Sequence, residues 1–293
     1  MRIVPHDAVL GASIEAIDLS QPIAPDAMAE LADALYAHRL LVFPGQQISM
    51  DAYDAFSRNW GEPYIETYQN MALPGHPAIM EVGNVGGVLE TADYRNGAAF
   101  WHTDRAYAPD CNAVTMLYCI HAPATGGETH FCNLAAAWEA LDAATKTEID
   151  GLFALHRYGA GEREDWEFSV HPMSEEQARL LPSPGRHALA RRHSVTGRTG
   201  LYAPAGSWIE VEGLTRDAAS ALMRRLKLHA IQERFIASHH YRAGDLVLWD
   251  NTATMHAAAP IGPAVDESSR RLLRRIVALG LPRVIRERTG QAA

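Results

Sequence analysis

Hydrophobic and polar positions follow two periods along this chain, one typical of helices and one typical of strands. In residues 25–38, Met28, Leu31 and Leu35 lie on one helical stripe, whereas Leu40–Phe43 is a continuous apolar run of strand length. The same criteria, with Ser49, Asn133, Ser174 and Thr215 as N-caps, predict helices over 25–38, 49–61, 133–150, 174–181 and 215–233. Strands are predicted within 3–18 around Gly11, and over 40–43, 113–121, 246–249 and 272–279.

The order of these elements favours an antiparallel sheet core that carries helical insertions, in one domain spanning 1–293. Strands and helices do not alternate as in a parallel α/β fold, and no glycine-rich nucleotide motif occurs. Residues 62–101 are rich in turn formers and too long for a simple connector, so we expect a lid or active-site loop there.

Composition and charge argue against several classes of function. The chain has 293 residues, of which 47% are hydrophobic and 21% charged, as in ordinary globular proteins. Its net charge of −9 argues against nucleic-acid binding, which needs a basic face. No apolar run approaches a membrane span or a signal peptide, and the three cysteines show no metal-binding spacing. We therefore expect a cytoplasmic protein with no membrane partner.

The candidate chemistry begins at Trp101-His102-Thr103-Asp104. On a strand, His102 and Asp104 would point to the same face and offer an imidazole and a carboxylate to one point. About two such pairs are expected by chance in a chain of this composition, so the pair alone is weak evidence. Downstream, the buried run 246–249 is followed by Asp250, Asn251 and then His256. Two histidines and one carboxylate form the facial triad of non-haem iron oxygenases, which leaves coordination positions open.

A second candidate feature is a group of four arginines around Leu272 and Leu273. Strand alternation places Arg271 and Arg275 on one face and Arg270 and Arg274 on the other. One pair must then point toward the core, where an arginine is costly unless an anion pairs with it. A solvated basic edge strand is the alternative interpretation.

Taken together, these motifs resemble the taurine/2,4-dichlorophenoxyacetate dioxygenase family of Fe(II)- and 2-oxoglutarate-dependent enzymes. The resemblance covers nearly the whole chain and rests on GASIEAIDLS (11–20), LLVFPGQQIS (40–49), WHTD (101–104), GGETHF (126–131), HSVTGRTGLY (193–202), WDN (249–251) and the arginines before IVALG (276–280). It implies a mainly β fold with helical insertions around a double-stranded β-helix, or jelly roll.

The resemblance also implies residue roles. His102, Asp104 and His256 match the metal ligands, while Thr129 and Arg271 match the residues that bind the distal carboxylate of 2-oxoglutarate. The activity implied is hydroxylation of a substrate C–H bond with Fe(II), 2-oxoglutarate and O₂, giving succinate and CO₂. Family members often form dimers or tetramers, so we expect a homo-oligomer.

The substrate is predicted only by class. Arg275 matches an arginine that faces the anionic group of acidic substrates, which favours a carboxylate, aryloxyalkanoate or sulfonate unless an acidic side chain holds Arg275. Taurine itself is disfavoured, because Glu66 and Ala98 replace polar residues of that branch. Further candidate substrate contacts flank the triad: Tyr68, Asn70, Tyr107, Tyr202 and Trp208. A non-catalytic jelly-roll metal-binding protein and a zinc hydrolase are the alternative functions, although neither explains Thr129 and Arg271.

Overall fold

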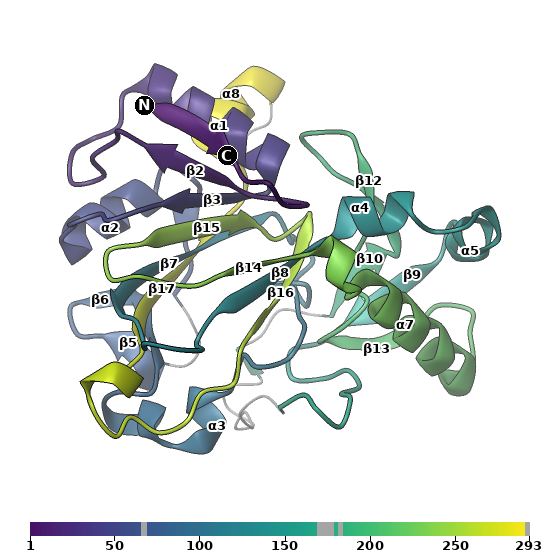
Figure 1. Ribbon diagram of the computed structural model, residues 1–293. Helices are drawn as coiled ribbons and strands as arrows, with labels where there is room; N and C mark the ends of the chain where they lie inside the picture. Colours follow the sequence, from purple (N-terminus) through teal and green to yellow (C-terminus); the bar gives the residue numbers. More distant parts are fainter. Residues whose placement is uncertain (66–68, 169–178, 181–183, 291–293) are drawn as a thin grey trace.

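Two antiparallel sheets face each other in the computed structural model, which describes residues 1–65, 69–168, 179–180 and 184–290 (Figure 1). Within these residues the larger sheet has nine strands, and β2 and β3 are its parallel pair. Its order is β1 (Arg2–Pro5), β2 (Ala12–Glu15), β3 (Leu40–Phe43), β15 (Leu246–Asp250), β7 (Ala113–His121), β17 (Leu272–Leu279), β6 (His76–Gly83) and β5 (Ala72–Leu73), with β4 (Glu62–Pro63) also beside β17. The smaller sheet has the order β14 (Ile236–His239), β8 (Thr129–Asn133) and β16 (Thr254–Ala258).

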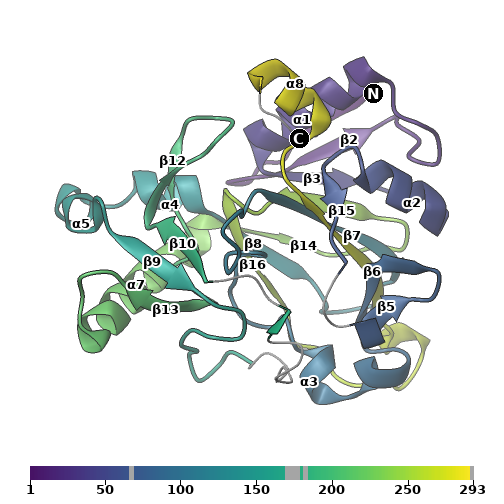
Figure 2. The ribbon, with the colours of Figure 1, turned by 180° about the vertical axis from the view of Figure 1, so that it is seen from behind.

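Helices cover the outer face of the larger sheet. α1 (Pro25–His38), α2 (Met50–Ser57) and α8 (Arg283–Thr289) lie on it, as both views show (Figures 1 and 2). Their apolar side chains, such as Leu31 and Phe56, pack with Leu248 of β15 and Ile276 of β17 in one core cluster. This burial removes apolar surface from water and fixes which face of each strand looks outward.

The inner face of the same sheet packs against the smaller sheet. Along β15, Leu246 and Leu248 join the outer cluster, whereas Val247 and Trp249 join a second cluster with Phe131 of β8. This alternation follows from the two-residue period of a strand. The face of β17 that carries Arg271 and Arg275 therefore looks into the space between the sheets, where Leu273 is fully buried.

A helical region with two small sheets flanks this β core. α4 (Leu134–Glu139), α5 (Ala143–Ile149) and α7 (Arg216–Ala230) lie close to β9 (Phe153–His156), β10 (Gly185–Ala188) and β13 (Trp208–Val211), and a third core cluster joins them (Figure 2). β11 (Ala190–Arg192) and β12 (Thr199–Leu201) form a hairpin beside α4, and α3 (Ala92–Arg95) lies at the far end of the larger sheet. No helix of the described residues is both long enough and apolar enough to cross a bilayer.

Most predicted elements are confirmed, two predictions are corrected, and the strand that carries His256 was missed. The predicted helix 133–150 is two helices, because the Asp142 side chain accepts a hydrogen bond from the Thr145 backbone N–H and starts α5 anew. α2 ends at Ser57 rather than near Gly61, and β16, which carries His256, was not predicted. Residues 174–178 and 181 of the predicted helix 174–181 lie outside the described residues.

The segment 62–101 contains more regular structure than its composition suggested. Strand β6 within it pairs with β17 along four residues, from Gly83 opposite Leu272 to Met80 opposite Arg275. Gly83 is needed at this edge, because its φ is +148° and a Cβ atom would lie 2.0 Å from the Arg271 carbonyl oxygen. Part of the predicted lid is therefore a strand of the main sheet.

Candidate active site

One cavity of about 200 Å³ opens between the two sheets and contains most of the predicted site residues. Its lining includes seven of them: His102, Asp104, Tyr107, Thr129, His256, Arg271 and Arg275. They come from the loop after α3 and from β8, β16 and the start of β17. The fold thus brings together residues that are up to 173 positions apart in the sequence.

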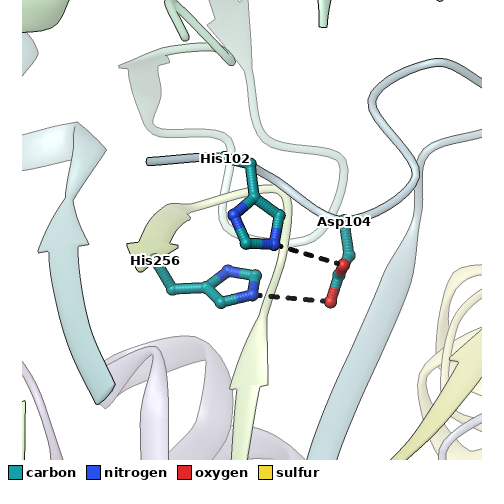
Figure 3. Close-up of side chains that lie close together, drawn as sticks. All are labelled: His102, Asp104 and His256. Atoms are coloured by element: carbon teal, nitrogen blue, oxygen red, sulfur yellow. Dashed lines mark ion pairs between the residues drawn. The ribbon is translucent and has the colours of Figure 1, made fainter. Parts of the chain in front are cut away.

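His102, Asp104 and His256, which all line this cavity, converge on one another (Figure 3). His102 Nε2 lies 3.8 Å from Asp104 Oδ1, and His256 Nε2 lies 3.7 Å from Asp104 Oδ2. Within the described residues, these three side chains form the one group of histidine, cysteine or acidic residues that is close enough together to hold a metal ion. All three side chains are largely buried, as a site that excludes bulk water requires.

The two histidines are positioned by their own backbones. His102 N–H donates to His256 O at 3.0 Å, and His256 N–H donates to His102 O at 2.8 Å, so the two residues form an antiparallel bridge. Gly206 packs against this bridge with a φ of +95°, and a Cβ there would lie 2.8 Å from His102 Cβ. The spacing of the imidazoles is therefore set by main-chain hydrogen bonds and by a close backbone contact.

The protonation of both histidines suits metal binding. His102 Nδ1 is 2.8 Å from Phe100 O, so it carries the proton and leaves the Nε2 lone pair directed toward Asp104. Burial lowers the pKa of His102, and it lowers the pKa of His256 well below its usual range. Both imidazoles are thus neutral at pH 7, which is the form that binds metals.

Asp104 is held by a network of polar side chains. Thr115 Oγ1 donates to Asp104 Oδ2 at 2.7 Å, and Asn251 Nδ2 donates to Thr115 Oγ1 at 2.8 Å. The side-chain oxygen Oδ1 of Asn251 accepts a hydrogen bond from Trp249 Nε1 at 3.1 Å, which orients the Asn251 amide. Arg275 Nη2 donates to Asp104 Oδ1 at 2.8 Å. Burial opposes the charge on Asp104, but the adjacent Arg275 guanidinium, which is always charged, lowers the pKa of this carboxyl well below its ordinary range.

Arg271 lies at another part of the cavity wall. Its Nε donates to Gly127 O at 2.9 Å, and its side chain is buried, with 6% of the residue exposed. Among the described residues, Arg271 has no ion-pair partner, and burial lowers its pKa. Thr129 is nearby, with its Oγ1 3.1 Å from the Tyr241 hydroxyl, and the Tyr241 ring centroid lies 5.7 Å from Arg271 Cζ. A buried cation without an anion is unfavourable, so this region is suited to an anionic ligand.

Comparison with known proteins decides the family. Residues 3–277 match the family described as "Taurine catabolism dioxygenase TauD, TfdA family". The chain belongs to this family. It is a 2-oxoglutarate-dependent non-haem iron dioxygenase, which uses Fe(II), 2-oxoglutarate and O₂, and its core is the jelly roll expected from the sequence.

Similar proteins span nearly the whole chain. The alpha-ketoglutarate-dependent 2,4-dichlorophenoxyacetate dioxygenase of Cupriavidus pinatubonensis is 31% identical over 285 residues, covering 94% of this chain and 96% of that protein. Pentalenolactone F synthase of Streptomyces arenae is 27% identical and covers 95% of each. The crystal structure of AAD-2 in complex with Mn(II) and N-oxalylglycine is 26% identical, with a TM-score of 0.79, covering 96% of this chain and 98% of that chain.

The site of this TauD/TfdA-family enzyme fits both Fe(II) and 2-oxoglutarate. The donor set of two imidazole Nε2 atoms and one carboxylate matches the facial triad of non-haem Fe(II) oxygenases. Arg271, which is buried and has no ion-pair partner among the described residues, fits the distal carboxylate of 2-oxoglutarate, because a guanidinium can form two parallel hydrogen bonds with a carboxylate.

The other predicted substrate residues lie in different environments. Tyr107 lines the cavity, whereas Asn70 lies beside it and donates from Nδ2 to the hydroxyl of Tyr94, which does line it. Tyr202 and Trp208 are buried in packing clusters and are not part of the lining. Tyr68 and Glu66 lie outside the described residues.

Several lining residues were missed by sequence reasoning. Phe100, Arg105, Met80, Tyr94 and Tyr158 complete the wall, and three of them belong to the segment 62–101. Position relative to the WHTD motif could have indicated Phe100 and Arg105, since they flank it directly. Met80 and Tyr158 carry no comparable signal, because only the tertiary fold brings them to the cavity.

Proposed function

We propose that this enzyme hydroxylates a C–H bond of a small organic anion, with succinate and CO₂ as coproducts. When bound, the iron, 2-oxoglutarate and O₂ supply the oxidising chemistry. The observation that carries the proposal is that the metal-ligand triad lines the same cavity as Arg271, a buried cation that no carboxylate of the described residues pairs with.

The chain's own residues bind and orient the reactants. His102, Asp104 and His256 would hold the metal, and the Asn251–Thr115 hydrogen bonds would keep the Asp104 carboxylate in place. Arg271, with Thr129 beside it, would bind the distal carboxylate of 2-oxoglutarate and so fix its orientation in a water-poor site. A structural metal site or a zinc hydrolase gives no role to this arginine.

Arg275 requires a revised interpretation. The expected preference for an acidic substrate rested on Arg275 being available to the substrate, but the structure pairs it with Asp104 at 2.8 Å. Arg275 alone therefore does not support an anionic substrate. The support comes from the relative named for 2,4-dichlorophenoxyacetate and from the further cationic side chains in the cavity lining.

Residues 62–101 provide one wall of the cavity, including Met80, Val82, Tyr94 and Phe100. We propose that part of this segment tightens over bound substrate as a lid does. Slower amide hydrogen exchange in 84–101 upon substrate addition is the expected result, and an exchange rate that does not change with substrate would contradict it.

We also propose that the enzyme is cytoplasmic and forms a homo-oligomer, either a dimer or a tetramer. Sedimentation can test the oligomeric state.

A succinate-release screen tests the reaction. The purified enzyme with Fe(II), 2-oxoglutarate and O₂ is offered aryloxyalkanoates, other carboxylates, sulfonates and uncharged analogues, and products are identified by mass. A product 16 mass units heavier than an acidic substrate, or its breakdown fragments, is expected together with stoichiometric succinate. Turnover without oxygen insertion, or hydrolysis supported by Zn(II) alone, would contradict the proposal.

A further inference from the structure

Arg105 is a cation of the cavity wall whose charge is not compensated by the described residues. It directly follows the metal ligand Asp104, lines the cavity and is half-buried. Its Nη1 approaches the Tyr107 hydroxyl at 3.4 Å, and its Nε is buried without a hydrogen-bond partner in the part of the chain that the structure describes. No ion pair joins it to a carboxylate among these residues.

The other arginines that line the cavity already have partners or fit the cosubstrate. Arg275 is paired with Asp104, and Arg271 lies beside Thr129, where it fits the cosubstrate. Arg95 donates from Nε to Ile261 O at 3.0 Å and from Nη1 to Glu90 O at 2.7 Å, so its guanidinium holds two backbone carbonyls. Among the described residues, Arg105 donates one long hydrogen bond, to the Tyr107 hydroxyl, and it is the lining arginine with no role yet in holding Asp104, the cosubstrate or backbone carbonyls.

The backbone and two aromatic rings hold the Arg105 side chain in place. Its φ of +64° is in the left-handed region, which residues other than glycine seldom adopt. Its Cζ lies 4.2 Å from the Tyr64 ring centroid and 5.2 Å from the Tyr107 ring centroid. These cation–π contacts orient a guanidinium without neutralising it, which leaves its charge available to a ligand.

We propose that Arg105 binds the acidic group of the primary substrate. This inference rests on the proposed function and specifies its substrate class: an organic carboxylate or sulfonate whose apolar or aromatic body packs against Phe100, Tyr107 and Met80. All three of these side chains line the same cavity as the metal ligands. A guanidinium fork matches an oxyanion group, and aromatic and thioether side chains suit an apolar body.

The test compares matched acids and amides in the wild-type enzyme and three variants. Each acid that triggers succinate release, beginning with phenoxyacetate and 2,4-dichlorophenoxyacetate, is paired with its uncharged primary amide. Arg105→Gln removes the charge and Arg105→Lys retains it. Arg95→Gln is the matched control, because Arg95 lines the same cavity but already binds two carbonyls.

The proposal predicts a rise of about 10- to 100-fold in KM for the acid in Arg105→Gln, as expected for losing a hydrogen bond to a charged group. KM for the amide should change little, Arg105→Lys should retain part of the preference for the acid, and Arg95→Gln should not change the ratio of acid to amide. An equal effect of Arg105→Gln on acid and amide would overturn the assignment. So would a wild-type enzyme that responds only to uncharged or cationic compounds, or to none of the acids.

A separate readout distinguishes this proposal from the proposed function. Binding of Fe(II) and 2-oxoglutarate, followed anaerobically by their visible charge-transfer band, should be the same in Arg105→Gln and in the wild-type enzyme. A normal band with no loss of acid preference means that Arg105 is misassigned while the dioxygenase function stands. Absence of the band in the wild-type enzyme would instead count against the dioxygenase site.

Discussion

The metal end and the cosubstrate end of the cavity are both anchored near β17, yet their charges are arranged differently. At the metal end, Asp104 interacts with Arg275 and Thr115 and faces two neutral imidazoles. At the cosubstrate end, Arg271 is buried with a backbone carbonyl as its polar partner and has no carboxylate among the described residues. The two arginines are only four positions apart: Arg275 lies on β17, Arg271 immediately precedes it, and both line the cavity.

This difference shows what each end is suited to bind. The metal end combines a carboxylate with neutral nitrogen donors and so offers negative charge to a cation, with its orientation fixed by outer hydrogen bonds. The cosubstrate end offers an uncompensated positive charge in a poorly hydrated place, which an anion would stabilise. Substitutions at either end should therefore affect metal binding and 2-oxoglutarate binding separately.

Removing a metal ligand should have the largest effect. His102→Ala or Asp104→Ala should lower substrate-dependent succinate formation by more than about 100-fold. Removing a residue that only hydrogen-bonds a metal ligand already costs about 10- to 100-fold, and removing the ligand itself should cost more. Activity and bound iron are measured together. His240→Ala, which changes a histidine with a 73% exposed side chain, is the control. Near-normal turnover in either ligand variant would reject the triad.

Replacing the unpaired arginine should weaken cosubstrate binding selectively. Arg271→Gln is expected to cost about 2–5 kcal/mol of 2-oxoglutarate binding, because a buried charge pair is lost. Titration of the anaerobic Fe(II) enzyme measures this affinity. Arg274→Gln is the control, because Arg274 pairs with Glu81 and lies on the opposite face of β17. If both variants bind 2-oxoglutarate like the wild type, Arg271 is not the cosubstrate arginine.

Loosening the support of Asp104 should have an intermediate effect. Thr115→Val removes the 2.7 Å hydrogen bond to Oδ2 and leaves the side-chain volume nearly unchanged. We expect iron affinity to fall by about 10- to 100-fold, with 2-oxoglutarate affinity at saturating iron little changed. Equilibrium dialysis gives the metal affinity, and Thr147→Val on the exposed side of α5 is the control. Unchanged iron binding would show that the Thr115 hydrogen bond does not support the site.

Asp250, just beyond the metal end, provides a smaller test on stability. Burial opposes its charge, but His193, with Nε2 2.7 Å from Oδ2, and Thr252 outweigh burial and lower its pKa. A lowered pKa stabilises the fold above the unfolded-state pKa of about 4, and this contribution is lost as the pH falls toward the folded-state pKa. Asp250→Asn should therefore reduce the free energy of unfolding at pH 7 by about 1–3 kcal/mol. The deficit should shrink below pH 4 in denaturant titrations, and a deficit independent of pH would contradict this account.

Sequence patterns predicted several strands with their observed bounds, but they did not predict every contact between residues far apart in the chain. Strands 40–43, 113–121 and 272–279 were predicted with the observed bounds, because each is an apolar or alternating run of strand length. His102 and Asp104 do converge, as their spacing predicted, but the strand assumed for them is an isolated bridge at His102 followed by a turn at Asp104. The antiparallel bridge between His102 and His256, however, depends on how β16 packs, and no local pattern indicates it.

The roles of the arginines illustrate the same limit. Alternation indicated that Arg271 and Arg275 share a face, which the cavity lining confirms. It could not show that Arg275 would pair with Asp104, since this contact joins residues 171 positions apart. Arg105 was overlooked because its importance comes from a left-handed backbone and from stacking on Tyr64, and neither feature is visible in the sequence.

Anaerobic visible spectroscopy is the most direct test of the assignment that one cavity binds Fe(II) through His102, Asp104 and His256 and binds 2-oxoglutarate through Arg271. We expect a metal-to-ligand charge-transfer band that appears only when both Fe(II) and 2-oxoglutarate are present. The band should be absent in His102→Ala and should require far more 2-oxoglutarate in Arg271→Gln. A wild-type enzyme without this band, or a band that both variants retain at wild-type concentrations, would contradict it.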